Sequence, residues 1–334
     1  MAGFLISLFL CTQFIHVDFE TLMGKQTSRW RFIADEQDKK AMAGYEALYE
    51  QNKNFQFLSE GEYKIPSEVH VIWLGPKPFP QESVQNMRMW IAEHPSWTVH
   101  FWTDRKRPSP VKGMLIHRVQ DFQFEFLEDY YLESTNWGQK SDILRYEILN
   151  QLGGVYIDHD ANCVRSFDGL HRGYDFYACL EVPHTRVDQR SVTAGIGIIG
   201  SAPRHPVIQG AIDEVMVNWE IVKQQFPQTS QKSLRDYVMH STYLALTRSM
   251  ENHLGQDQYC DMIFPASYFY PQKSLTPIYS YHYYGTSWAD IQKEDQSERQ
   301  IRKSYKHLVK QQRKALLLLG LCLGSTLLLF WRRK

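Results

Sequence analysis

Residues 141–160 read SDILRYEILNQLGGVYIDHD and combine a helical pattern with a short strand. Apolar residues recur at helical spacing, and Ser141 can cap the first turn. Gly153-Gly154 would end the helix, and the run 155–157 (VYI) then has the character of a buried strand. The stretch therefore predicts a helix followed closely by a strand, with acidic residues directly after the strand.

The alternation of strands and helices extends toward the N-terminus. Residues 69–74 (VHVIWL) form a β-rich run that Gly75-Pro76 ends. Residues 81–92 have a helical pattern, and residues 97–102 (WTVHFW) alternate as a second strand. This alternation is typical of an α/β fold with a mainly parallel sheet, in which ligands bind beyond the carboxyl ends of the strands.

Charged side chains gather around the end of the strand at 155–157. Asp158 and Asp160 are two residues apart, so in extended backbone their carboxylates point to the same side. Hard oxygen ligands at this spacing suit Mg²⁺ or Mn²⁺, with phosphate groups completing the coordination shell. Asp142 and Arg145 share a helix face upstream, and we expect both to project toward the same pocket.

Other interpretations of these residues stay open. Two acids after a strand also occur in solvated loops, and Asp142 with Arg145 could form an ordinary ion pair on a helix surface. A phosphatase of the haloacid dehalogenase type begins with a strand and the pattern DxDxT. Here Ala161 and Asn162 follow Asp160, so the expected threonine is missing and the phosphatase hypothesis is weakened.

The middle of the chain resembles glycosyltransferase family 32, the family with a DXD-containing sugar-binding region. That family includes yeast initiating and sphingolipid mannosyltransferases, bacterial capsular enzymes and, more distantly, the clostridial glucosylating toxins. Beside the stretch quoted above, five segments occur in the family's order: 65–75 (IPSEVHVIWLG), 94–104 (HPSWTVHFWTD), 201–208 (SAPRHPVI), 264–271 (FPASYFYP) and 281–288 (YHYYGTSW).

The resemblance implies a GT-A fold, in which one α/β domain binds a nucleoside-diphosphate sugar and Mn²⁺ or Mg²⁺. It also implies transfer of the sugar with retention of anomeric configuration. Asp160 matches the direct metal ligand. Asp158 matches the first acid of the DXD motif, which contacts ribose or sugar, in some members through the metal. Both are therefore candidate metal ligands and candidate catalytic residues.

Further roles follow from the same resemblance. Asp142 and Arg145 match a pair of catalytic and donor-binding residues near the sugar and phosphate. Trp73 matches an aromatic residue that stacks on the nucleotide base, although packing within the strand is an equal alternative. His282 and Trp288 match donor-binding and catalytic positions on a loop that closes over the leaving diphosphate, and packing is again the alternative.

One segment departs from the family pattern. Residues 192–200 (VTAGIGIIG) occupy a region where many members have an asparagine-containing strand, and here it offers Ala194 and Gly195. Contacts to donor or acceptor at this place are therefore in doubt. No residue is assigned as a catalytic base.

Composition and hydropathy divide the rest of the chain. Of the 334 residues, 43% are hydrophobic, and 37 basic residues balance 37 acidic ones, which disfavours nucleic acid as a partner. The pattern predicts five regions: an apolar N-terminal segment (1–20), a helical extension (21–64), the GT-A domain (65–290), a charged helical connector (291–314) and a transmembrane helix (315–331).

The C-terminal run 315–331 (ALLLLGLCLGSTLLLFW) carries no charged residue. As a helix it would extend roughly 26 Å, enough for a thin bilayer core. A buried core helix and an interfacial helix are the alternatives. We expect a single-pass membrane protein with its catalytic domain in the cytosol, since the sparse cysteines and the lack of an Asn-x-Ser/Thr acceptor favour a reducing compartment.

These observations predict a membrane-associated, metal-dependent glycosyltransferase. It would move a hexose from a nucleoside-diphosphate sugar to a lipid or glycan acceptor. One alternative is an effector-type glycosyltransferase that modifies host proteins. Another, from a different class, is a non-catalytic membrane protein that binds nucleotide sugars.

Overall fold

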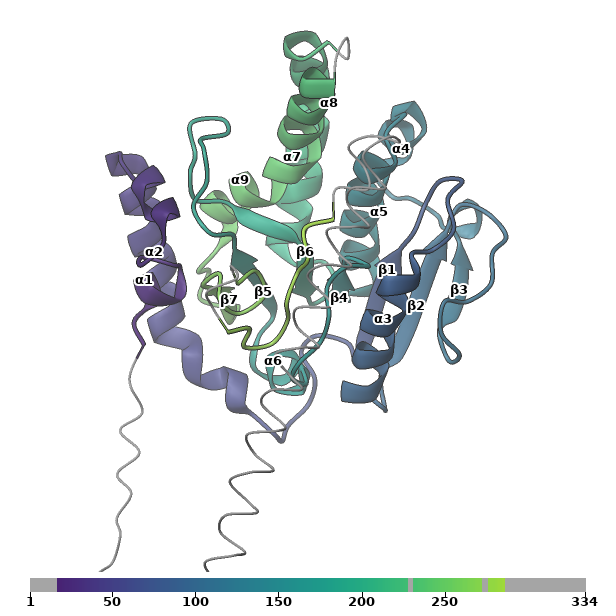
Figure 1. Ribbon diagram of the computed structural model, residues 1–334, viewed down its shortest axis with the longest axis horizontal. Coiled ribbons are helices and arrows are strands. Elements are labelled where there is room, and N and C mark those ends of the chain that lie inside the picture. Colours follow the sequence, from purple (N-terminus) through teal and green to yellow (C-terminus); the bar gives the residue numbers. More distant parts are fainter. Residues whose placement is uncertain (1–16, 228–230, 272–275, 286–334) are drawn as a thin grey trace, which may run out of the picture.

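The computed structural model describes residues 17–227, 231–271 and 276–285 (Figure 1). The strands are β1 (Glu68–Ile72), β2 (Thr98–Thr103), β3 (Leu115–Arg118), β4 (Gly154–Ile157), β5 (Phe176–Leu180), β6 (Ala194–Ser201) and β7 (Asp261–Phe264). The α-helices are α1 (Phe19–Leu22), α2 (Glu36–Asn52), α3 (Gln81–Glu93), α4 (Glu128–Glu133), α5 (Trp137–Leu152), α6 (Asp168–Gly173), α7 (Pro206–Gln225), α8 (Gln231–Val238) and α9 (Leu244–His253). Shorter turns of 3₁₀-helix are η1 (Ser28–Phe32), η2 (Lys53–Phe57) and η3 (Val119–Asp121), and η4 (Met239–Tyr243) is a π-helix.

The strands form one sheet with the order β3-β2-β1-β4-β6-β5-β7. Strands β3, β2, β1 and β4 run parallel to one another, and β5 is parallel to β7. Strand β6 lies between β4 and β5 and is antiparallel to both. The expectation of an α/β fold with a mainly parallel sheet is therefore confirmed, and β6 makes the sheet mixed.

Helices surround this sheet. In Figure 1, α3 lies in front of β1 and β2, and α7, α8 and α9 form a group beside α5. Helix α7 packs against both α5 and α9. Buried side chains on both faces of the sheet belong to one hydrophobic core, which explains why β4 and β5 are apolar throughout.

Helix α5 begins earlier than the sequence indicated. Ser141 was expected to cap it, but the helix starts at Trp137, and the Asn136 side chain accepts a hydrogen bond from the Gln139 amide at 3.0 Å. Asn136 is the better cap because its side-chain oxygen reaches the first orphan N–H groups. Ser141 is therefore an interior residue of the helix.

The two glycines after α5 are required by the backbone. Gly153 and Gly154 have φ angles of 68° and 89°, a region that L side chains rarely adopt. A Cβ atom on Gly154 would also lie 2.8 Å from the Glu68 carbonyl oxygen on β1. The pair ends the helix, as predicted, and lets β4 start directly beside β1.

The N-terminal extension (21–64) belongs to the same body as the sheet. Its helix α2 packs against β7. In Figure 1, α1 and α2 lie on the side of the sheet that ends in β7. The Tyr49 and Tyr268 hydroxyls are 2.8 Å apart, and the Asn52 side chain donates to the Asp261 carbonyl at 2.8 Å. The extension therefore contributes to the hydrophobic core instead of forming a separate appendage.

The end segments of the chain lie outside the described residues. These are residues 1–16 of the apolar N-terminal segment, the connector 291–314 and the apolar run 315–331. Among the described helices, none has the length and apolar character needed to cross a membrane.

Candidate functional site

The DXD turn directly follows β4. The Asp158 amide donates to the Gly197 carbonyl on β6 at 2.7 Å, so the turn is fixed to the neighbouring strand. His159 points the other way: its Nδ1 lies 2.8 Å from the Ser83 hydroxyl, and its carbonyl accepts from Asn86 at 3.1 Å. With His159 held by α3, the carboxylates on either side of it face the opposite direction. They point to the same side as expected, but through a turn, in which the Ala161 amide donates to the Asp158 carbonyl at 3.0 Å, and not through extended backbone.

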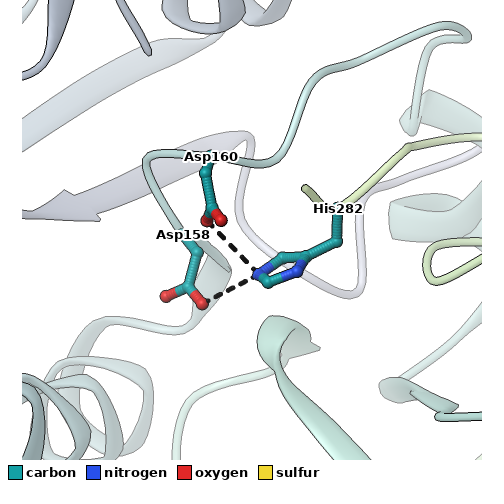
Figure 2. Close-up of side chains that lie close together, drawn as sticks. All are labelled: Asp158, Asp160 and His282. Carbon is teal, nitrogen blue, oxygen red and sulfur yellow. Dashed lines mark hydrogen bonds and ion pairs between the residues drawn. The ribbon is translucent and has the colours of Figure 1, made fainter. Parts of the chain in front are cut away.

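Asp158, Asp160 and His282 form one cluster (Figure 2). The His282 Nε2 atom lies 3.1 Å from Asp158 Oδ2 and 3.3 Å from Asp160 Oδ1. One possible ligand atom from each of the three residues lies within 4.8 Å of the others. Residues more than 120 positions apart in the sequence are thus brought together at the carboxyl end of β4.

Backbone pairing carries His282 to this place. Ala161 and His282 form an antiparallel bridge, and the Tyr283 amide donates to the Asp160 carbonyl at 3.0 Å. The Gly285 amide donates to Asp160 Oδ2 at 2.5 Å. The segment 279–285 therefore lies along the residues after the DXD motif, and its position depends on the Asp160 carboxylate itself.

The charges in the cluster stabilise one another. Burial would raise the pKa of Asp158, but Arg145 and then His282 outweigh it and hold that pKa well below its usual range. Burial would lower the pKa of His282, but Asp160 and Asp158 raise it to about 9. Nε2 lies between the two carboxylates, and Nδ1 lies 3.1 Å from the Tyr284 amide, which can donate to it only when the ring is neutral.

Asp142 and Arg145 lie on α5, next to Asp158 of this cluster. They pair on one face of α5, with Arg145 Nη2 2.7 Å from Asp142 Oδ1, as their spacing predicted. Arg145 Nη2 is 3.6 Å from Asp158 Oδ1, and its guanidinium lies over the Tyr156 ring at 4.1 Å. Burial raises the pKa of Asp142 to about 6, although Arg145 opposes this.

Both Asp142 and Arg145 are buried, with 6% and 4% of their surface exposed. The Thr242 hydroxyl donates to the second oxygen of Asp142 at 2.7 Å, and Arg145 Nη1 donates to the Ile196 carbonyl. In this arrangement their contact with the site runs through Asp158. Direct contact with a donor sugar stays a prediction.

The residues present fit a divalent cation. Two carboxylates and one imidazole supply hard and borderline donors that Mn²⁺ and Mg²⁺ sites use. Gly197 keeps room for an ion, because a Cβ atom there would lie 2.7 Å from Asp158 Oδ2 and 2.8 Å from His282 Nε2. Sequence reasoning missed Gly197, although the three glycines of 192–200, at positions 195, 197 and 200, were a signal for close approach to a strand.

The structure describes one of the two predicted tryptophan site residues, Trp73, and not the other, Trp288. Trp73 is 7% exposed, donates its indole N–H to the Lys77 carbonyl at 3.0 Å, and packs edge-on against His159. It is thus a packing residue next to the DXD turn, and stacking on a base stays a prediction. Trp288 lies outside the described residues.

A cavity of about 580 Å³ opens beside the cluster, on the side of β5. Tyrosines from the His282 segment form one wall, and Glu181, the residue after β5, is part of its lining. Burial raises the pKa of Glu181, while His184 and His282 oppose this. Apart from Pro271 and the tyrosines near His282, none of the lining residues belongs to a segment that carried the family resemblance.

Comparison with known proteins assigns the region around this site. Residues 80–177, which contain Asp142, Arg145, Asp158 and Asp160, match the family model described as "Glycosyltransferase sugar-binding region containing DXD motif". The resemblance inferred from the sequence is therefore confirmed. His282, Trp73 and the cavity-lining Glu181 lie outside the matched residues.

Several curated proteins share part of the sequence. A mannosyl phosphorylinositol ceramide synthase of Saccharomyces cerevisiae is 24% identical over 64% of this chain and 50% of its own length. Subversion of eukaryotic traffic protein A of Legionella pneumophila is 29% identical over 34% of this chain and 20% of its own length. Inositol phosphoceramide mannosyltransferase 3 of Schizosaccharomyces pombe is 29% identical over 35% of this chain and 30% of its own length.

Among solved structures, the PaToxG glycosyltransferase has 17% sequence identity and a TM-score of 0.45, covering 66% of this chain and 81% of that one. The chain spans half or less of the three curated relatives described above. The predicted enzyme class agrees with the matched family and with the names of the mannosyltransferase relatives. Residues 80–177 of this chain therefore match, as the sequence predicted, the family of glycosyltransferase sugar-binding regions that contain a DXD motif.

Proposed function

We propose that this protein is a metal-dependent glycosyltransferase. It transfers a hexose from a nucleoside-diphosphate sugar to a lipid or glycan acceptor, with retention of configuration. One observation carries the proposal: Asp158, Asp160 and His282 converge at the carboxyl end of β4, within and beside the matched sugar-binding region. In α/β sheets this is the edge at which ligands bind.

The residues of the site have different roles in this proposal. Asp160, Asp158 and His282 would hold Mn²⁺ or Mg²⁺, which when bound neutralises the diphosphate and helps it depart. Arg145 fixes the Asp158 carboxylate, and Asp142 fixes Arg145. The Gly285 amide couples the closing segment to Asp160, so the metal site and the cover over the donor are formed together.

A panel of thermal-shift measurements tests the donor and the metal. The full chain is incubated with UDP-sugars and GDP-sugars, each with and without Mn²⁺ or Mg²⁺. A ligand that binds only the folded protein raises its Tm. We expect an increase that needs both the metal and one type of nucleotide. A folded sample that shows no shift with any nucleotide would favour the non-catalytic or phosphatase alternatives.

Membrane association is a separate part of the proposal. It rests on the uncharged run 315–331 and on the ceramide named in the yeast synthase relative. Deleting residues 315–334 should move the protein from the membrane pellet to the supernatant while donor cleavage continues. Continued pelleting of the deletion variant would assign the membrane contact to another segment, such as the apolar N-terminal run.

A second candidate is an effector-type glycosyltransferase acting on host proteins. The Legionella relative, named for subversion of eukaryotic traffic, favours it. Incubation with radiolabelled donor and eukaryotic cell lysate distinguishes the two. Label in the lipid extract supports the first candidate, and label in protein bands supports the second.

A further inference from the structure

Three histidines lie side by side on the parallel half of the sheet. His70 on β1 is paired in register with His100 on β2, and His117 lies on β3. The His70 and His100 rings stack with their centroids 4.9 Å apart, and His100 Nδ1 lies 2.8 Å from His117 Nε2. The His117 ring also stacks on Trp102 of β2 at 4.4 Å. These three rings, which we call the histidine cluster, therefore join neighbouring strands through their side chains.

Hydrogen bonds fix His70 as a neutral ring. Its Nε2 lies 2.9 Å from the Gly153 carbonyl, which only accepts, so Nε2 carries the proton. Its Nδ1 lies 3.3 Å from the Trp102 indole nitrogen, which only donates. Because His70 is fully buried, a second proton on Nδ1 would put a charge into the core and set it against the indole N–H. His70 can therefore take up a second proton only when these contacts open.

The contact between His100 and His117 excludes a fully charged pair. One of the two facing nitrogens must donate and the other accept, so two protonated rings would place two N–H groups against each other. Burial, and then the neighbouring histidines, lower the pKa of His70 to about 3 and that of His100 to about 4. Burial also lowers the pKa of His117. Below about pH 6.5 the folded cluster thus holds fewer protons than an unfolded chain would.

Glu68 is the carboxylate that faces the rings. Among the described residues it lies within ion-pair distance of two of them, with Oε2 3.8 Å from His70 Nε2 and 3.7 Å from His100 Nε2. Burial raises the pKa of Glu68, so this carboxylate is neutralised early in acidification. It therefore gives a charged ring little compensation at the pH where compensation would be needed.

Charged side chains on the neighbouring elements have other partners. The Glu147 carboxylate of α5 accepts from the backbone amides of 125–127, and Arg118, next to His117, donates to Gln120 at 3.0 Å. From the segment after β3, Phe122 packs edge-on against Trp102. A protonated imidazole here would gain mainly the weak attraction of aromatic rings.

The histidine cluster connects the edge of the sheet with the strand of the metal site. Strand β3 is the edge strand and pairs with β2 (Figure 1). Its residues Leu115 and Ile116 are exposed, so their side chains add little burial to its stability. On the other side, His70 is bonded to Gly153, which directly precedes β4 and its DXD turn. Opening of the cluster would therefore affect β3 first and the start of β4 second.

We propose that His70, His100 and His117 form an acid-sensitive switch in the sheet. With all three rings neutral, the cluster holds β3 against β2 and holds Gly153 against β1. Proton uptake breaks the contact between His100 and His117 and releases β3 from the edge of the sheet. Donor binding then weakens, because the start of β4 loses its bond to His70; this last step alone rests on the proposed function.

Hydrogen exchange of the full chain, corrected for the intrinsic pH dependence of amide exchange, tests the release of β3. The stabilisation by the cluster is complete above about pH 6.5 and is lost progressively toward about pH 4 and 3, the pKa values of His100 and His70 in the fold. Each proton taken up makes opening about tenfold more favourable per pH unit. We expect the protection of 115–118 to fall at least about tenfold between about pH 6 and pH 5, with a much smaller change in β6.

The double variant His100→Gln/His117→Gln removes the titrating pair and keeps side chains that donate and accept. Its loss of β3 protection over the same interval should be less than about threefold. The single variant His117→Gln changes a half-buried residue at the sheet edge, and it should give an intermediate loss even where the double variant does not fold. A matched control is His253→Gln, which replaces a half-buried histidine on α9 and should behave as the wild type.

Three results would overturn the switch. One is an equal acid-induced loss of β3 protection in the wild type and the glutamine variants of the cluster. Another is full β3 protection in the wild type at about pH 5. The third is a parallel loss in β3 and β6, which would mean that the whole fold opens instead of its edge.

Donor binding tests the connection with the metal site. Binding of Mn²⁺ and the nucleotide from the donor panel is measured at about pH 7.5 and pH 5.5 for the wild type and the cluster variants. His282 is present in all of them, so a smaller acid-induced loss in the variants reports the histidine cluster. Equal losses would contradict the effect on donor binding. A wild type that binds no nucleotide at either pH contradicts the proposed function instead, and the exchange result for β3 is unaffected.

Discussion

The two halves of the sheet contribute differently to the site. Strands β3, β2, β1 and β4 are parallel, and the carboxyl end of β4 supplies Asp158 and Asp160. The half formed by β6, β5 and β7 is mixed, and it supplies Gly197 against the cluster and Glu181 in the cavity. The first half thus carries the acids of the motif, whereas the second determines the space around them.

Substitution of Asp160, which follows the parallel half of the sheet, should have the largest effect on donor binding. Asp160→Asn keeps an oxygen for the Gly285 amide but removes a charged metal ligand. We expect metal-dependent donor binding to fall by more than about 100-fold, beyond the usual loss for residues that only support metal ligands. Calorimetry with Mn²⁺ and nucleotide measures it.

The control for this variant is Asp213→Asn, which changes an exposed carboxylate on α7. It should bind metal and donor as the wild type does. Wild-type transfer by Asp160→Asn would show that the metal assignment is wrong.

Gly197→Ala tests the contribution of the second half. The new methyl group would lie 2.7 Å from Asp158 Oδ2 and 2.8 Å from His282 Nε2, so the cluster must move. Overpacking of this kind costs about 1–3 kcal/mol, which we expect to appear as weaker Mn²⁺ binding and a lower Tm.

Gly44→Ala is the matched control. Gly44 lies within α2, and a Cβ atom there meets no other atom within 4 Å. Alanine should stabilise the helix by about 0.5–1 kcal/mol without affecting Mn²⁺ binding. Equal behaviour of the two alanine variants would contradict the role given to Gly197.

The stabilisation that His282 provides through Asp158 and Asp160 should depend on pH. Its pKa is raised to about 9 in the fold, above the ordinary value of 6.5. In metal-free protein the resulting stabilisation is full below about pH 6.5 and is lost as the pH rises through about 9. The Tm advantage of wild type over His282→Gln should therefore shrink across this interval.

Added Mn²⁺ should stabilise the wild type more as the pH rises, since the neutral imidazole, and not the imidazolium, is the form that can hold a metal. Parallel Tm curves for wild type and His282→Gln would contradict the raised pKa of His282.

The smallest effect is expected at Trp73, on the β1 side. Trp73→Phe removes the indole hydrogen bond to Lys77 but keeps an aromatic ring against His159. We expect the free energy of unfolding to fall by about 1 kcal/mol, with little change in nucleotide affinity. A large loss of nucleotide affinity at unchanged stability would instead show that a base stacks on this ring.

The sequence predicted β1, α3, β2, α5 and β4 of the parallel half, although not β3, because their signals are local. The elements at 69–74, 81–92 and 97–102 follow one another in the chain and in the sheet, and Gly153-Gly154 marks a helix end by its conformation. The start of α5 was misplaced, since Asn136 caps the helix earlier than Ser141, and β1 ends at Ile72, two residues before the end of the predicted run.

Residues of the other half could not be predicted in the same way. Glu181 and Arg29 meet in one cavity only because β6 inserts between β4 and β5 and the N-terminal extension packs beside β7. Such pairings join distant segments, and no local pattern encodes them. His282 was found through resemblance to a family, and its bridge to Ala161 explains physically why it reaches the motif.

The central claim is that Asp158, Asp160 and His282 form the metal site on which donor binding depends. Titration of Mn²⁺ into the full chain, with and without the nucleotide from the donor panel, tests it most directly. We predict one metal site per chain whose affinity rises with nucleotide and is lost in both Asp160→Asn and His282→Gln. Equal Mn²⁺ and nucleotide binding by the wild type and both variants would contradict the account.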